Sequence, residues 1–172
     1  KQEAPSSYIK NSNRYVYGTL TNDEKKAYIE IYTALKNREN RVTPSVELSN
    51  ADLTKVAEDV FFQEPTNYVT TKFGVNGNTV VFVYDFTAAE AAAMDKACDN
   101  AMSKIKAKFP ANASDYDKVK VIHDYIVQNT VFSKDNKYSA YAYGPLVAGV
   151  GQCEGYAKAM SYALTYFGLE NV

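Results

Sequence analysis

The sequence predicts a helix-rich α+β fold with five main helices and an antiparallel β-hairpin. Four helix starts are visible because a Ser or Thr is followed three residues later by an acid, and then by apolar residues at helical spacing. Asn76-Gly77, which tolerates the positive φ of a tight turn, predicts the hairpin between two alternating segments. A chain of 172 residues is long enough to bury a core as one domain, or as one domain with an appendage.

Four pairs of residues predict the first four helices. In each pair, the hydroxyl oxygen accepts a hydrogen bond from an otherwise unpaired backbone amide. The acid, three residues later, accepts one from the backbone amide of the Ser or Thr. Pro65 ends the second helix and Pro110 ends the long third one. The pairs are Thr21 with Glu24, Ser49 with Asp52, Thr87 with Glu90, and Ser114 with Asp117.

The remaining segments are predicted from their turn residues and their apolar pattern. Residues 1–19 are polar and predict an irregular arm that ends in a short strand or extended segment. The hairpin strands are predicted at residues 68–75 and 78–86. Glycines and a proline predict a loop over residues 133–151, after which the fifth helix runs from about residue 153 to residue 167.

The fifth helix is predicted to bury one stripe of large apolar side chains. Gly168 is its natural C-cap, and Ala157 and Ala163 allow close approach of a neighbouring element. The predicted inward stripe is Tyr156, Met160, Leu164 and Phe167.

Composition and charge exclude several classes of protein. The net charge of −1 and the mildly acidic pI argue against a nucleic-acid binder, because such proteins carry a strongly basic surface. No apolar run approaches the roughly 18 residues of a membrane span. The abundant tyrosines suit either sugar or peptide binding or a half-wet core, and the core interpretation is preferred. Because the chain begins with Lys1 and shows no signal peptide, we expect a processed or cut product.

The segment GVGQCEGYAKA, residues 149–159, places Cys153 at a predicted helix start, where it could be a reactive thiol or a small apolar residue. Backbone amides and the helix dipole favour negative charge there, and hence the thiolate form of Cys153, which is the nucleophile. Gly151 and Gly155 remove side chains on both sides, so a substrate backbone could approach, while Glu154 opposes the thiolate. From the residues alone, a small buried cysteine is the preferred interpretation of Cys153, because most free cysteines are of that kind. Cys98, which falls on the apolar stripe of the third helix, is predicted to be structural.

His123 is the only histidine in the sequence. It is predicted to face inward beside Ile122 and Ile126, as a neutral core histidine with one hydrogen-bond partner. Asp124 is expected to point elsewhere on the helix rather than orient the ring. The alternative makes His123 the base for Cys153 within this chain. One histidine and two distant cysteines lack the spacing of metal ligands, and no cofactor is expected.

Residues 115–132, DYDKVKVIHDYIVQNTVF, and the last 34 residues, above all YGPLVAGVGQCEGYAKA, resemble bacterial transglutaminase-like domain proteins. This resemblance implies a papain-like Cys–His–Asp site in which Cys153 is the nucleophile. The His and Asp of the family come on strands after the cysteine helix, and are therefore expected beyond Val172. Gln152 and Tyr143 are weak candidates for holding the oxyanion, and the Cys153 amide is a better donor.

The resemblance also implies an organisation and a function. Residues 1–110 would form an N-terminal helical and hairpin region, and residues 111–172 the N-terminal half of a transglutaminase-like core without its sheet. The implied chemistry is acyl transfer on a protein or peptide, as in a transglutaminase, deamidase or protease. The alternative is a non-catalytic extracellular module for binding or structure. The resemblance also implies that the protein is secreted or lies at the cell surface.

Because residues 111–172 are expected to lack the sheet of a transglutaminase-like core, we also expect another chain or segment to pack against them. The apolar faces of the fifth helix would be short of a neighbour, and exposed patches of that kind usually meet another chain or segment. We therefore expect self-association through this face, or a covering segment elsewhere in the protein. No nucleic acid and no membrane span are expected.

Overall fold

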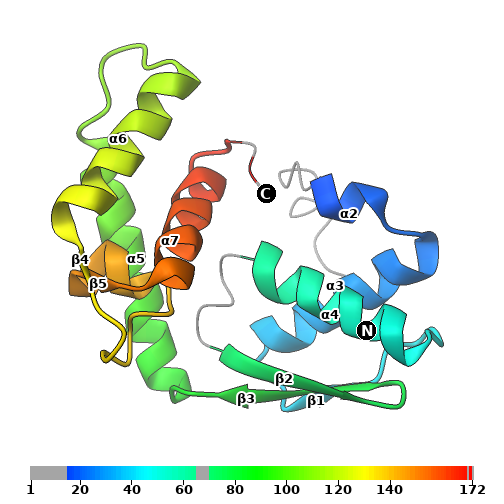
Figure 1. Ribbon diagram of the computed structural model, residues 1–172. Coiled ribbons are helices and arrows are strands. Elements are labelled where there is room, and N and C mark those ends of the chain that lie inside the picture. The colour runs from blue at the N-terminus through cyan, green and yellow to red at the C-terminus, as the bar shows by residue number, and fades with distance from the viewer. Residues whose placement is uncertain (1–14, 65–69, 170, 172) are drawn as a thin grey trace. The chain divides into compact units, whose positions relative to one another are not determined.

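The computed structural model describes residues 15–64, 70–169 and 171 (Figure 1). Most of the predicted arm, and the start of the first hairpin strand, lie outside these residues. The contacts divide the chain into two compact units, residues 1–86 with 170–172, and Thr87–Leu169. The sequence predicted a division after residue 110, so the long third helix lies in the second unit instead of the first.

The first unit contains three described helices and a three-stranded antiparallel sheet. The helices are α2 (Tyr15–Thr19), α3 (Asn22–Lys36) and α4 (Asn50–Gln63). The strands are β1 (Arg41–Val42), β2 (Thr70–Asn76) and β3 (Thr79–Tyr84), in the order β1-β3-β2. The helical class and the antiparallel hairpin are as predicted.

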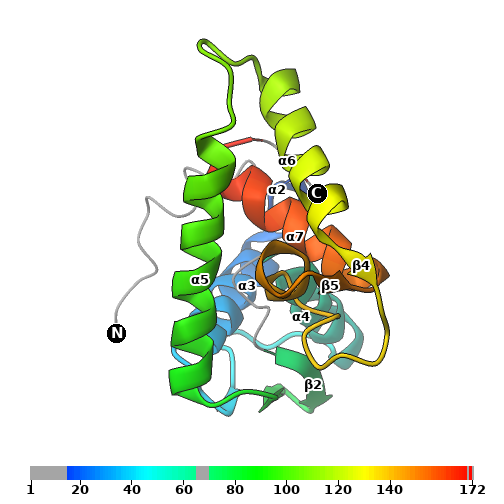
Figure 2. The same ribbon diagram turned by 90° about the vertical axis from the view of Figure 1, so that its left-hand side faces the viewer.

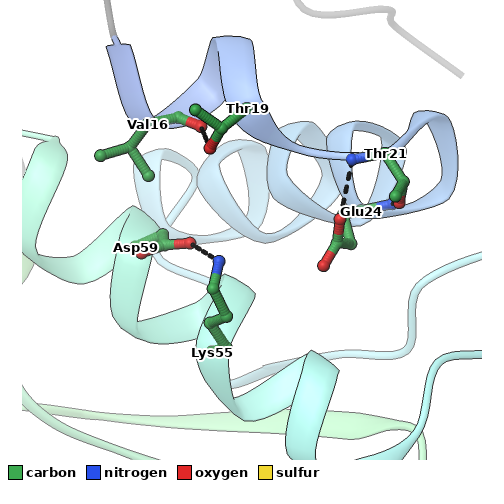
Figure 3. Close-up of polar contacts among 6 residues, drawn as sticks. All are labelled: Val16, Thr19, Thr21, Glu24, Lys55 and Asp59. Atoms are coloured by element: carbon green, nitrogen blue, oxygen red, sulfur yellow. Dashed lines mark hydrogen bonds and ion pairs between the residues drawn. The ribbon is translucent and has the colours of Figure 1, made fainter.

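Helix α2 replaces the extended segment that the sequence predicted at the end of the arm. The Thr19 hydroxyl donates to the Val16 carbonyl at 2.8 Å, which closes the short helix (Figure 3). The Tyr17 ring packs edge-on against Tyr28 of α3, with centroids 5.2 Å apart. This aromatic contact outweighs the local preference of a Tyr-Val-Tyr segment for extended backbone.

The hairpin turn lies one residue later than the sequence suggested. Asn76 pairs with Thr79, so Gly77 and Asn78 form the two-residue turn, and Gly77 has the positive φ of 56°. β1, which the sequence did not predict, pairs with the other side of β3. A two-residue strand carries too little periodicity to be recognised before its partner is known.

The core of the first unit lies between α3, α4 and one face of the sheet (Figure 1). β3 turns Val80 and Phe82 into this core and leaves Val81 and Val83 exposed on its other face, as the alternation predicted. Both helices begin as predicted, since Thr21 and Ser49 accept from the amides of Glu24 and Asp52.

The second unit packs three long helices around a short irregular segment (Figure 2). Two helices begin with the predicted capping boxes of Thr87 and Ser114. The elements are α5 (Ala88–Lys106), α6 (Asp115–Asn129), β4 (Val131–Phe132), η2 (Gly144–Ala148), β5 (Val150–Gly151) and α7 (Cys153–Tyr166).

The predicted loop over residues 133–151 contains regular structure. A π-helical turn, η2, precedes β5, and β5 pairs in parallel with β4 through Val131 opposite Val150 and Phe132 opposite Gly151. This parallel ladder of two residues was not predicted, and whether the chain lacks the sheet of a transglutaminase-like core stays a prediction. Glycines had suggested an unstructured loop, but Gly144 is needed here because a Cβ would lie 2.4 Å from the Tyr138 carbonyl oxygen.

Helix α7 buries a different face from the one predicted. Tyr156, Met160, Leu164 and Phe167 are only half-buried. The buried face is rotated by roughly a third of a turn from the predicted stripe, because α7 packs its small residues closely against η2 and α6. Its members are Gly155, Lys158, Ala159, Tyr162 and Ala163.

No helix in the described part of the chain is both long and apolar enough to cross a membrane.

Candidate functional site: the start of helix α7

Cys153 is the first residue of α7, and its side chain is exposed. Gln152, at the N-cap, makes no side-chain capping bond. Among the described residues, the backbone amides of Cys153, Glu154 and Gly155 have no hydrogen-bond acceptor. An exposed thiol therefore lies at the positive end of a helix dipole, beside backbone amides that no side chain caps.

A loop preceding η2 holds this helix start in place. The Gln152 amide donates to the Ser139 carbonyl at 2.9 Å, and the Tyr156 amide donates to the Gln152 carbonyl at 3.0 Å. Ser139 is 1% exposed. The main chain on both sides of Cys153 is therefore held by backbone hydrogen bonds, one of them to the buried Ser139, while the thiol itself is exposed.

The two glycines beside Cys153 serve the packing of the protein rather than the approach of a substrate. A Cβ at Gly155 would lie 2.0 Å from the Ser139 carbonyl oxygen. A Cβ at Gly151 would lie 2.8 Å from the Pro145 ring and 3.1 Å from the Tyr156 ring. Both glycines are buried, so our interpretation of them as open space for a substrate backbone is wrong. The protein's own chain fills that space.

Gln152 and Tyr143 lie in different settings. Gln152 is the half-buried N-cap of α7, next to the thiol in sequence. Tyr143 precedes η2, and its ring packs against Tyr138 with centroids 4.9 Å apart. That ring contact agrees with the loop-packing interpretation of Tyr143, and the part of either residue in holding an oxyanion stays a prediction.

Cys98 shows the opposite environment for a thiol. It is fully buried on α5, as its place on the apolar stripe predicted. Burial raises its pKa to about 12, and the nearby carboxylates of Asp95 and Asp99 act in the same direction. Cys98 is thus a small core residue, and it provides an internal reference for the exposed thiol.

His123 is not a core histidine. Its side chain is 62% exposed, because the buried stripe of α6 consists of Ile122 and Ile126, and His123 lies beside that stripe. Asp124, which we expected to point elsewhere, lies 3.1 Å from the His123 ring nitrogen Nδ1. The same carboxylate accepts from Lys120 at 2.5 Å, and these two bonds lower the pKa of Asp124. His123 and Cys153 are not hydrogen-bonded to each other, so the alternative of a Cys153–His123 pair gains no support.

Sequence reasoning missed a buried lysine one turn inside α7. The Lys158 ammonium lies 2.6 Å from the Glu154 carboxylate, and its side chain is only 9% exposed. The Tyr141 ring lies beneath it, 5.9 Å from nitrogen to centroid. The spacing of four residues between Glu154 and Lys158 was a visible signal for the pair, but nothing in the sequence indicated its burial.

Neither a search for metal sites nor the comparisons with known proteins give further information about the start of α7. Within residues 15–64, 70–169 and 171, no cluster of three His, Cys, Asp or Glu side chains is arranged to hold a metal ion. Comparison with the models of known protein families and with curated proteins found no match to this chain. The resemblance to transglutaminase-like proteins therefore rests on the residues quoted above.

Proposed function

We propose that this protein carries out cysteine-dependent acyl transfer on protein or peptide substrates, with Cys153 as the nucleophile. The observation that supports the proposal is the exposed thiol at the start of α7, which has no side-chain cap and is held by the backbone hydrogen bonds of Ser139 and Gln152. The quoted resemblance supplies the class of chemistry. It also suggests secretion or the cell surface as the place of action.

The chemistry proceeds through a thioester. The Cys153 sulfur attacks an acyl carbonyl carbon, and the carbonyl electrons move onto its oxygen, which open amides at the helix start are suited to stabilise. The carbon–nitrogen bond then breaks, and ammonia or an amine leaves with a proton. Water or a second amine finally takes the acyl group and releases the thiol.

A base is required to take the thiol proton and to return a proton to the leaving amine. His123 makes no hydrogen bond to Cys153, so we assign this role to a histidine outside this chain, oriented by an aspartate. That assignment follows the pattern of the resembling family, in which both residues come after the cysteine helix. Glutamine–amine cross-linking, deamidation and peptide hydrolysis differ only in the leaving and accepting groups.

Incorporation of a labelled primary amine into a glutamine-containing peptide tests the proposal. The parent protein is compared with its Cys153→Ala and Cys98→Ala variants, with ammonia release and peptide cleavage followed in parallel. We expect one of the three reactions to require Cys153 and to survive the loss of Cys98. No reaction and no trapped thioester in the parent protein would overturn the proposal, and would favour the non-catalytic module.

A further inference from the structure

Lys158 is a buried cation that the packing of α7 alone does not require. It is on the buried face of the helix, beside Ala159 and Tyr162, where an apolar side chain would serve. Lysine is almost never buried without a partner, because an unpaired ammonium away from water is strongly unfavourable. The Glu154 carboxylate at 2.6 Å is that partner.

The ion pair has one buried member and one partly exposed member. The Lys158 nitrogen lies 2.6 Å from the Glu154 carboxylate and 5.9 Å from the centroid of the Tyr141 ring, which is itself 3% exposed. Solvent-exposed pairs at this spacing fluctuate and contribute little. A pair with one desolvated member is held more firmly, so the direction in which Glu154 points is set by Lys158.

Glu154 is also the charge next to Cys153 in the first turn. A carboxylate at that position opposes the thiolate, whereas a carboxylate that is drawn away and neutralised does not. Lys158 lies about 140° around the helix axis from Cys153. It therefore draws Glu154 toward the buried side, away from the exposed thiol.

The elements around this helix start carry charges of their own, including Lys134, Asp135 and Lys137 on the loop that contains Ser139. Glu154 and Lys158 are the only acid and the only lysine or arginine of α7, and η2 and β5 contain neither. On α6 the charged side chains Lys118 and Lys120 pair with acids of the same helix. On α5, Asp99 accepts from the Tyr162 hydroxyl at 3.3 Å.

We propose that Lys158 is a positioning residue that neutralises Glu154 and turns it away from Cys153, so that the thiolate forms beside an acid without being opposed by it. This inference rests on the proposed function, in which Cys153 is the nucleophile. Lys158 itself touches neither the thiol nor a substrate.

The rate of Cys153 alkylation by iodoacetamide between pH 5 and pH 9, followed by mass spectrometry, tests the inference. We expect Lys158→Met to slow alkylation at pH 7 by about fivefold and to shift its pH profile upward. Lys158→Arg should retain the parental rate, and adding Glu154→Gln to Lys158→Met should restore it to within about twofold. Lys104→Met, at an exposed position on α5, is the matched control and should change nothing.

The buried Cys98 reports whether each variant remains folded, because it should stay unlabelled in the native protein. An unchanged profile in Lys158→Met with Cys98 protected, or a double variant that stays slow, overturns the inference. If Lys158→Met exposes Cys98, Glu154→Gln alone decides: because the parental carboxylate is already neutralised, a rate within about twofold of the parental rate supports the role. An acceleration of several-fold would show that Glu154 still opposes the thiolate, and would overturn the role. Shifted profiles without any acyl transfer would overturn the proposed function instead.

Discussion

Helices α5 and α7 of the second unit begin in opposite ways. At α5, the Thr87 hydroxyl oxygen accepts from the Glu90 amide, and the Glu90 carboxylate accepts from the Thr87 amide at 2.8 Å. At α7, Gln152 makes no side-chain cap and an exposed cysteine follows it. α3, α4 and α6 resemble α5 in using a Ser or Thr cap.

This difference indicates what each helix start is for. A capped start satisfies its own amides and contributes to stability without any further partner. The start of α7 is held through its backbone, by the Ser139 carbonyl, and leaves its first amides and its thiol open. Changes at the capped starts should therefore alter stability, and changes at Cys153 should alter chemistry.

The largest effect is expected at Gly155, where the start of α7 meets the Ser139 loop. Gly155→Ala should destabilise the protein by about 3 kcal/mol, because the new Cβ would lie 2.0 Å from a buried carbonyl oxygen. Helix propensity alone would favour alanine by about 1 kcal/mol, so the clash decides the sign. Urea unfolding at pH 7 measures the change.

Gly18→Ala is the matched control for that substitution. Gly18 is in α2, and nothing lies within 4 Å of the position of its Cβ. The same change should therefore be neutral or slightly stabilising. A Gly155→Ala variant as stable as the parent would mean that the Ser139 loop does not hold the start of α7.

The next largest difference in stability is expected between the alanine variants of the two cysteines. Cys98→Ala removes a fully buried sulfur from the apolar face of α5 and should cost about 1.5 kcal/mol in the free energy of unfolding. Cys153→Ala removes an exposed sulfur and should cost less than about 0.5 kcal/mol. Thermal or urea unfolding compares them, and a larger loss at Cys153 would show that its thiol is a packing residue.

The helix caps themselves give a smaller contrast. Thr87→Ala removes the hydroxyl that caps α5 and should destabilise by about 1 kcal/mol. Gln152→Ala removes a side chain that makes no capping bond, so its effect should be close to zero. Equal losses for the two variants in urea unfolding would erase the distinction between the two helix starts.

The smallest effect is a pH dependence at the capped helix starts. The pKa of Glu90 is lowered by its hydrogen bonds with the Thr87 backbone and side chain, so its ionised form stabilises the folded state. This contribution is present above the ordinary carboxyl pKa of 4.5 and is lost as the pH falls through the lowered value. Glu90→Gln should be less stable than the parent at pH 7, with the difference shrinking at pH 3.

Glu58→Gln, at an exposed position of α4 outside any cap, provides the control for that pH dependence. It should give the same small difference from the parent at both pH values. If the Glu90→Gln difference were also independent of pH, its carboxylate would not be contributing through the cap.

The starts of the long helices could be predicted because capping is local. The hydroxyl, the amide that it accepts from and the answering acid all lie within four residues of sequence. The hairpin was predictable for the same reason, apart from a one-residue displacement of its turn to Gly77-Asn78. Two-residue ladders such as β4 with β5 carry no pattern of their own, and were missed.

The predictions about the site that were wrong, or that could not be made, concern features that depend on tertiary packing. Gly155 was interpreted as free space, but its Cα is covered by the Ser139 carbonyl from a loop 16 residues earlier. His123 shares a helix with Ile122 and Ile126, yet the buried stripe is narrow enough to leave it exposed. The burial of Lys158 depends on where α7 turns its small residues, which no local spacing specifies.

Competitive alkylation of the native chain tests most directly whether Cys153 is an exposed, reactive thiol and Cys98 a buried, unreactive one. The two cysteines are labelled with iodoacetamide at pH 7, and each rate is measured by mass spectrometry, with a short unstructured cysteine peptide as the reference. The account predicts that Cys153 reacts faster than the peptide and that Cys98 stays unlabelled until the protein unfolds. A Cys153 that reacts more slowly than the peptide, or two cysteines that react at the same rate, would contradict it.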